Sequence, residues 1–147
     1  MELRTLHMED AQSMMEVIRE AFAAEPWNDR WEDEGVFWQY LTDLVGNANS
    51  LALGLYAGDV LAGLALGRLK HWFDGVEYCI DDLCVRSGRQ GQGIGSAFLT
   101  LLQTYAKAQG YKSLSLRTNR NAPAYHFYQR NGFQERQDQV FFEKPLR

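Results

Sequence analysis

Three glycines stand at alternate positions between an apolar run and an amphipathic pattern, in the stretch Arg89-Gln90-Gly91-Gln92-Gly93-Ile94-Gly95. Glycine tolerates positive φ and leaves neighbouring amide N–H groups open to a ligand. The start of a helix adds unpaired N–H donors and the positive end of the helix dipole. Such a turn suits a phosphate or pyrophosphate, and no acidic side chain interrupts it. The stretch therefore predicts a site for a nucleotide-like anion.

The spacing of the glycines separates the known anion-binding motifs. A P-loop has a lysine after its glycines, and none follows here. A dinucleotide fingerprint needs a third glycine where Ser96 stands, and an acid about 20 residues on, yet the region near Leu116 has none. The segment instead reads Q-x-x-G-x-G, from Gln90 to Gly95. A second block follows downstream, with Asn121, Ala124, Phe127-Tyr128 and Asn131-Gly132-Phe133.

The two blocks resemble the GNAT superfamily of acetyltransferases, whose pyrophosphate motif is Q-x-x-G-x-G and whose ending is N-x-x-A-x-x-F-Y-x-x-x-G-F. Asp82-Leu83-Cys84-Val85 resembles the strand that leads into that family's glycine turn. The resemblance covers nearly the whole chain and implies a single domain over residues 1–147. It also implies acetyl-CoA as the donor and an N-acetyltransferase that acts by direct transfer in a ternary complex.

Hydrophobic periodicity and turn residues predict an α/β fold. Strands are expected at 2–7, 51–57, 60–69, 78–85, 113–117 and 140–143. Helices are expected at 9–23, 33–44, from 94 to a stop at Gly110, and 121–130, with Asn121 as the cap of the last. This order resembles the GNAT fold. The resemblance implies a mixed, mostly antiparallel sheet that splays between strands 4 and 5, is flanked by about four helices and holds the cofactor in the gap.

Length and composition narrow the class of protein. At 147 residues, 46% of them apolar and 23% charged, the chain is long enough for one folded domain with its own core. A net charge of −4 argues against nucleic acid as a partner, and no apolar run approaches the ~20 residues of a membrane span. Cys79 and Cys84 fall on one predicted strand, too far apart to pair. Free thiols and the lack of an export signal predict a cytoplasmic protein.

The resemblance assigns the cofactor contacts. The glycine turn and the first residues of the helix would present N–H groups to the pyrophosphate, and the lead-in strand would bind the pantetheine arm through its backbone. A glycine loop that only makes a tight turn is the alternative. Cys84 has no histidine near it in sequence, so a buried structural thiol is favoured over a nucleophile. The full set is Leu83, Cys84, Val85, Arg89, Gln90, Gly91, Gln92, Gly93, Ile94, Gly95, Ser96, Asn121 and Tyr128.

Acetyl transfer to an amine needs a neutral amine and a proton for the leaving thiolate. Tyr128 stands where many GNAT enzymes place a tyrosine hydroxyl near the thioester sulfur, and a phenol stays protonated at neutral pH. The alternative for Tyr128 is aromatic packing beside Phe127. His7, His71 and His126 have no metal-ligand spacing with the cysteines, so no metal is expected.

Three carboxylates on the lead-in strand, Glu77, Asp81 and Asp82, are candidates for the general base. The catalytic set that we select contains Asp81 and Glu77. The offset of Asp81 from the glycine turn resembles that of the base in some aminoglycoside acetyltransferases. Strand alternation sends Glu77 and Asp81 to one face and Asp82 to the other, unless a bulge intervenes. For each of the three, a solvated strand-end carboxylate is the alternative.

Residues 25–34 hold five carboxylates and two tryptophans, Trp27 and Trp31. Acidic side chains attract a cationic amine, and tryptophan faces bind one by cation–π contact. The carboxylates and tryptophans of this segment, with Asp81 and with Trp72 as the opposite wall of the site, predict a small cationic acceptor such as a polyamine or an aminosugar. The competing interpretation is that Asp33 and Glu34 favour a helix N-terminus and that the tryptophans pack.

Two further functions stay open at the level of sequence. One is a catalytically silent module that binds or senses acyl-CoA, and the other is an acetyltransferase acting on protein N-termini or lysines. Tyr128 and the nearby carboxylates favour the small-molecule enzyme, because a pure binder needs neither. Dimers are common in the family, so the resemblance allows a homodimer.

Overall fold

The computed structural model describes residues 1–23, 26–86, 88, 91 and 93–147. Residues 1–117 form one compact unit and residues 118–147 a second. None of the helices in the described ranges has the length and apolar content that crossing a bilayer requires. The elements of the first unit are β1 (Glu2–Thr5), a short 3-10 helix η1 (Met8–Asp10), α1 (Ala11–Phe22), α2 (Glu34–Val45), β2 (Ser50–Ala57), β3 (Val60–Trp72), β4 (Gly75–Val85), α3 (Ile94–Ala108) and β5 (Ser113–Leu116).

The five strands form one mixed sheet in the order β1-β2-β3-β4-β5. The first four pair antiparallel, and β5 joins β4 in parallel. The β4–β5 ladder runs from Glu77 opposite Ser113 to Ile80 opposite Leu116, whereas β4 continues to Val85. The predicted α/β fold with a mixed sheet is confirmed. The end of β4 extends beyond its ladder with β5, at the place where the splay was expected.

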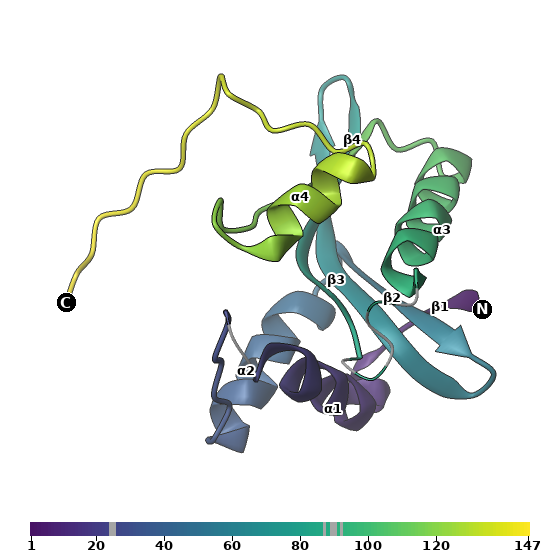
Figure 1. Cartoon of the computed structure of the whole chain (residues 1–147), viewed down its shortest axis with the longest axis vertical. Coiled ribbons are helices and arrows are strands. Elements are labelled where there is room, and N and C mark those ends of the chain that lie inside the picture. Colours follow the sequence, from purple (N-terminus) through teal and green to yellow (C-terminus); the bar gives the residue numbers. More distant parts are fainter. Residues whose placement is uncertain (24–25, 87, 89–90, 92) are drawn as a thin grey trace. The chain divides into compact units, whose positions relative to one another are not determined.

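Helices α1 and α2 cover one face of the sheet, and α3 covers the other (Figure 1). Leu64 of β3 belongs to the apolar cluster that α1 and α2 form with the sheet. A β-carbon added at the preceding residue, Gly63, would stand 3.4 Å from the ring of Phe98 on α3. Because successive side chains of a strand point to opposite faces, the two groups of helices lie on opposite sides.

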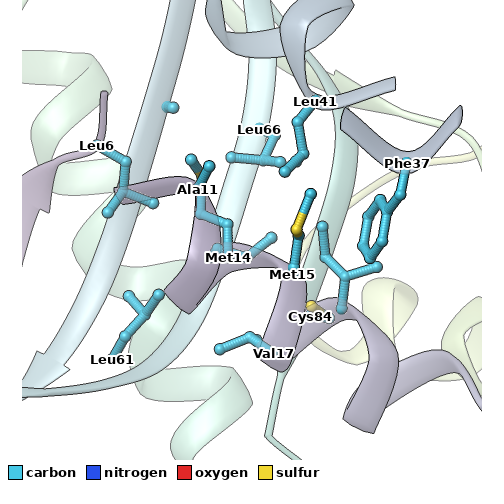
Figure 2. Close-up of a cluster of buried hydrophobic side chains, with 13 residues drawn as sticks. Leu6, Ala11, Met14, Met15, Val17, Phe37, Leu41, Leu61, Leu66 and Cys84 are labelled. Carbon is cyan, nitrogen blue, oxygen red and sulfur yellow. The ribbon is translucent and has the colours of Figure 1, made fainter. Parts of the chain in front are cut away.

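The larger core lies between α1, α2 and the sheet. Figure 2 shows Met14 and Met15 of α1 among side chains from α2 and the strands, including Phe37, Leu66 and Cys84. The α1 residues recur at the spacing that the sequence predicts for a buried helix face. Burying each large apolar side chain contributes about 1.5–3 kcal/mol, so this face fixes α1 and α2 on the sheet.

The second unit contains α4 (Pro123–Arg130), and its start corrects one prediction. Ala122, with extended φ −84° and ψ 151°, is the N-cap, and no side-chain hydrogen bond caps α4 among the described residues. The capping role expected of Asn121 is therefore wrong. The physical reason is Pro123, because proline pushes the residue before it out of the helical region and itself suits the first helical position.

The chain beyond α4 corrects a second prediction. In the structure, residues 140–143 form no strand, and the side chains of Val140 and Phe142 are 74% and 89% exposed. The run was predicted from β-branched and aromatic residues. Such residues form a strand only where a partner takes their backbone N–H and C=O groups, so composition alone was not sufficient.

Candidate active site

The glycine turn leads into α3 with an open backbone. Gly93 is the N-cap of α3 with φ 74°, and Gly91 has φ 78°, both in the left-handed region. A β-carbon placed on either would have no atom within 4 Å among those described. Helix α3 begins at Ile94, whose buried side chain anchors it. The predicted helix start is confirmed, and Gly95 and Ser96 fall in the first turn, where backbone N–H groups lack partners within the helix.

The other residues predicted to contact the cofactor lie on β4, on α4 or its approach, or outside the described residues. Arg89, Gln90 and Gln92 are outside the described residues. Leu83 and Val85 are half-buried in the part of β4 beyond the β5 ladder, opposite Ala65 and Gly63.

Cys84 is buried in the cluster under α1 and α2. Burial raises the pKa of its thiol well above the ordinary value, and the nearby Asp82 adds to the rise. A thiol that stays protonated is a weak nucleophile. The burial predicted for this thiol is confirmed.

The register between β3 and β4 contains a bulge at Asp81. Leu66 lies opposite Asp82, but its neighbour Gly67 lies opposite Ile80, so Asp81 is an extra residue in β4. Asp82 shares the face of Leu66, beneath α1 and α2. Because the bulge resets the alternation, Glu77 lies on that same face rather than on the opposite one. The exception foreseen for simple strand alternation is the arrangement that the structure adopts.

The carboxylates of Asp81 and Glu77, which were selected from the sequence, both accept hydrogen bonds from side chains of the first unit. Nη1 of Arg68 lies 3.2 Å and 3.0 Å from the two carboxylate oxygens of Asp81. Nε1 of Trp72 donates to Oε1 of Glu77 at 2.7 Å, and Oγ of Ser115 donates to Oε2. Burial raises the pKa of Glu77, but hydrogen bonds from Ser115, Trp72 and Cys79 outweigh it and leave the pKa below its ordinary value.

Asp82 has a different environment from the other two carboxylates. The hydroxyl of Tyr40, on α2, donates a hydrogen bond to its Oδ2. Burial raises the pKa of Asp82 to about 7, and the negative charge of Asp29 contributes. Tyr40 lies in an apolar stripe of the helix expected at 33–44, and sequence reasoning gave its hydroxyl no role. The available signal was the polar hydroxyl within an apolar stripe, together with two adjacent acids on one strand.

The tryptophans of the predicted acceptor site pack within the first unit. Trp31 stacks on Phe37, with ring centres 4.5 Å apart, and its ring centre is 4.8 Å from that of Tyr40. Trp27 meets Phe22 edge-on at 5.7 Å. Packing, the competing interpretation, thus describes both residues, and their contact with a substrate stays a prediction.

Asp33 and Trp72 have partners within the chain as well. The Asp33 carboxylate accepts from the N–H groups of Gly35 and Val36 at 2.8 Å and 3.2 Å, so it caps α2 as the competing interpretation expected. Nζ of Lys70 stands 4.3 Å from the ring centre of Trp72. This tryptophan already has a cation of the chain's own, and its contact with an acceptor stays a prediction.

In the second unit, Tyr128 is half-buried on α4. Its ring centre lies 5.4 Å from that of Phe127 and 5.5 Å from that of Phe133. The aromatic packing considered for Tyr128 is therefore present, and it is compatible with a hydroxyl that acts elsewhere. The acid role of Tyr128 stays a prediction.

One protein family matches most of the chain. A model of the acetyltransferase (GNAT) family matches residues 11–133, a range that includes most of the first unit and about half of the second. A streptothricin acetyltransferase from Streptomyces lavendulae is 38% identical over 74 residues. Those residues are 50% of this chain but only 38% of that protein, so the match spans well under half of the relative's length.

Solved structures resemble the chain over nearly its full length. An aminoglycoside acetyltransferase from an uncultured soil metagenomic sample, in complex with sisomicin, has a TM-score of 0.75 at 19% identity, covering 99% of this chain and 96% of that one. An integron cassette protein from the mobile metagenome of V. cholerae has a TM-score of 0.79 at 17% identity, with 98% and 91% covered. At such identities the likeness shows the fold.

Proposed function

The chain belongs to the acetyltransferase (GNAT) family, and we propose that it moves an acetyl group from acetyl-CoA to a primary amine of a small cationic molecule, such as a polyamine or an aminosugar. The transfer would be direct, with both substrates bound together. The observation that carries the proposal is the succession of β4 and α3. A strand bearing three carboxylates, Glu77, Asp81 and Asp82, leads into a helix whose N-terminus opens through glycines.

The start of α3 fits the pyrophosphate of acetyl-CoA. Gly91 and Gly93 leave free space where side chains would stand, and the N–H groups of the first turn point out of the helix end. When bound, acetyl-CoA supplies the acetyl group as a thioester. We propose that Ile94, Gly95 and Ser96 hold the phosphates with these glycines and with Arg89, Gln90 and Gln92, which lie outside the described residues.

Other residues are proposed to orient the donor and to move its protons. The backbone of Leu83, Cys84 and Val85 would bind the pantetheine arm, because this part of β4 extends beyond its ladder with β5. Asn121 would reach the cofactor without capping α4. The Tyr128 hydroxyl would give a proton to the leaving sulfur.

The acceptor class rests on charge and on the named relatives. Asp29 and Glu32 are exposed in the segment between α1 and α2, and such carboxylates attract cations. The relatives described as streptothricin and aminoglycoside acetyltransferases support a small acceptor that carries amino groups. We propose that Trp27 and Trp31 contribute to the wall of this acceptor site.

The experiment is thiol release from acetyl-CoA with a panel of polyamines, aminosugars, neutral amines and acidic amines, with the product identified by mass spectrometry. Turnover on cationic amines is the expected result. Turnover only on neutral or acidic amines would reject the acceptor class. Tight binding of acetyl-CoA with no turnover on any amine would reject the enzyme in favour of a silent binder or of a macromolecular acceptor.

A further inference from the structure

Among the three carboxylates of β4, we infer that Asp82 is the group that takes a proton from the acceptor ammonium, and that Tyr40 positions it. The inference rests on the proposed function. It differs from the choice made on sequence offset, which selected Asp81 and Glu77. Four features of the first unit carry it: the bulge in β4, the hydrogen bond from α2, the partners of the other two carboxylates, and a buried donor next to Tyr40 that no described residue partners.

The bulge determines which carboxylate faces α2. With Asp81 as the extra residue, Asp82 lies opposite Leu66, on the face that α1 and α2 cover. The hydroxyl of Tyr40 then reaches Oδ2 of Asp82 across 42 positions of sequence. Asp82 is half-buried, so its carboxyl group is held by α2 while part of it remains accessible to a small molecule.

The charged and titratable groups around Asp82 come from each neighbouring element. Asp29, in the segment before α2, adds a second negative charge, and Cys84 of the same strand is a protonated thiol. The cation of α1, Arg19, is directed elsewhere, since it donates to the carbonyl oxygen of Trp31 at 3.1 Å. It also pairs with Glu34 at 3.6 Å. This environment favours the protonated form of Asp82 and attracts an ammonium ion.

The proton-transfer properties of the three carboxylates differ. Burial raises the pKa of Asp82 to about 7, and a base is most effective when its pKa lies near the working pH. The oxygens of Asp81 are occupied by the guanidinium of Arg68 at 3.0 Å and 3.2 Å. Those of Glu77 accept hydrogen bonds from Trp72 and Ser115, and the pKa of Glu77 is lowered. Glu77 is therefore the weaker base, because these hydrogen bonds stabilise its charged form.

The proton balance of the step is complete. One N–H proton of the ammonium moves to an oxygen of Asp82, which leaves the nitrogen with a free electron pair and Asp82 neutral. The nitrogen then bonds to the acetyl carbon while the carbon–sulfur bond breaks. A second proton leaves the nitrogen as the thiolate acquires one, and Asp82 returns its own proton to solvent. One amide, one thiol and one released proton result.

Trp31 provides an independent sign that this side of α2 receives a ligand. Its Nε1 is buried and has no hydrogen-bond partner among the residues that the structure describes. Its ring centre is 4.8 Å from that of Tyr40. Buried donors without a partner are rare and call for an explanation. A hydroxyl or ether oxygen of an acceptor whose ammonium lies at Asp82 would supply the missing partner.

The test compares two isosteric changes, Asp82→Asn and Asp43→Asn. Asp43 lies on α2, where it accepts a hydrogen bond from Gln39 at 3.0 Å, and no role is assigned to it. For Asp82→Asn we expect kcat/KM to fall by about 100-fold or more and the rise of kcat/KM with pH to disappear, while acetyl-CoA binds with unchanged affinity in calorimetry. Asp43→Asn should keep the rate and the pH profile. An Asp82→Asn enzyme with the wild-type pH profile would overturn the inference.

The alternatives give distinct outcomes. Asp81→Asn and Glu77→Gln should both retain the rise of kcat/KM with pH, and loss of that rise in either, with Asp82→Asn unaffected, would make that residue the base. Wild-type protein that binds acetyl-CoA but turns over no amine would overturn the proposed function, and the base with it. Turnover that survives Asp82→Asn would overturn the base alone.

The pH profile of Tyr40→Phe separates a positioning role of Tyr40 from a structural one, and NMR tests the titration of Asp82 without reference to activity. Tyr40→Phe removes the hydrogen bond that stabilises charged Asp82, so the inflection of the pH profile should move to higher pH. A purely structural Tyr40 would lower the rate at every pH without moving the inflection. Carbon-13 NMR of the free protein should show an aspartate titrating near neutral pH that is absent in Asp82→Asn. Absence of such a signal in the wild type would overturn the inference without reference to activity.

Discussion

Gly67 of β3 lies directly against the backbone of Cys79 on β4. A β-carbon added at Gly67 would overlap the carbonyl oxygen of Cys79 and stand 2.9 Å from Cα of Ile80. Gly67 is also the residue at which the β3–β4 register shifts. A glycine inside a strand commonly marks such a close approach or a bulge. The bulge that turns Asp82 toward α2 therefore depends on the absence of a side chain on the neighbouring strand.

Gly67→Ala should consequently destabilise the protein and disturb the site together. The new methyl group meets backbone atoms, which cannot move aside as a flexible side chain would, so we expect a loss of about 1–3 kcal/mol or more. Urea unfolding measures the loss. Gly88→Ala is the matched control, because a β-carbon there would have no described atom within 4 Å. An unfolding midpoint equal to that of the wild type would show that the β4 backbone shifts without loss of stability and that the bulge does not need Gly67.

The raised pKa of Asp82 predicts an effect on stability with a definite sign. The folded-state pKa of about 7 lies above the ordinary value of 3.8, so the folded protein holds this proton more tightly than the unfolded chain. The contribution of Asp82 to the free energy of unfolding therefore falls as pH rises from about 4 to about 7, and is constant above. The shift of about three units corresponds to about 4 kcal/mol at most.

Asp82→Asn removes this titration and should gain stability relative to the wild type as pH rises. The quantity to measure is the free energy of unfolding of Asp82→Asn minus that of the wild type. This difference is determined at pH 8 and at pH 4, and the value at pH 4 is subtracted from the value at pH 8. We expect a positive value of up to about 4 kcal/mol. The subtraction cancels the other titrating groups. A value near zero would mean that Asp82 has an ordinary pKa in the folded state.

The elements of the fold were within reach of sequence reasoning because each is decided by neighbouring residues. Met14, Met15 and Ile18 recur at helical spacing and are buried on α1. Gly93 marks the start of α3 and has the positive φ that glycine permits. The cap of α4 was misplaced by one residue because the steric effect of Pro123 on Ala122 overrides the preference of Asn121.

The arrangement of the carboxylates was beyond reach for the opposite reason. Asp82 faces α2 only because Asp81 is an extra residue in β4, next to the pair that Ile80 forms with Gly67 of β3. Its hydrogen bond to Tyr40 joins an element far away in sequence. Neither contact leaves a local pattern of spacing. An offset from the glycine turn counts positions along β4, whereas a bulge changes the face of the sheet on which the side chain at each position lies.

Trp31→Phe separates packing from ligand binding at the side of α2. Phenylalanine keeps an aromatic ring against Phe37 and Tyr40, and it removes the buried Nε1 that has no partner in the described part of the chain. Stability should change by about 1 kcal/mol or less, because the lost ring contacts and the removed unsatisfied donor oppose each other. The KM for an oxygen-rich acceptor should rise several-fold with little change in kcat. An unchanged KM would assign Trp31 to packing alone.

The two ends of α3 offer a matched test of the glycine turn. Gly93 begins the helix at φ 74° and Gly110 follows its end at φ 77°, and a β-carbon at either would meet no described atom within 4 Å. Alanine at both places has the same cost, about 1–2 kcal/mol for a left-handed backbone. The two variants should lose similar stability in urea unfolding.

Their affinities for acetyl-CoA should differ. At Gly93 the methyl group projects into the space proposed for the pyrophosphate and turns N–H groups away from it, whereas Gly110 lies at the opposite, negative end of the helix dipole. Calorimetry should show the Kd of acetyl-CoA raised at least about 10-fold in Gly93→Ala, equivalent to about 1.4 kcal/mol, and unchanged in Gly110→Ala. Equal affinities in the two variants would mean that the turn is only a tight connection between β4 and α3, and that the donor binds elsewhere.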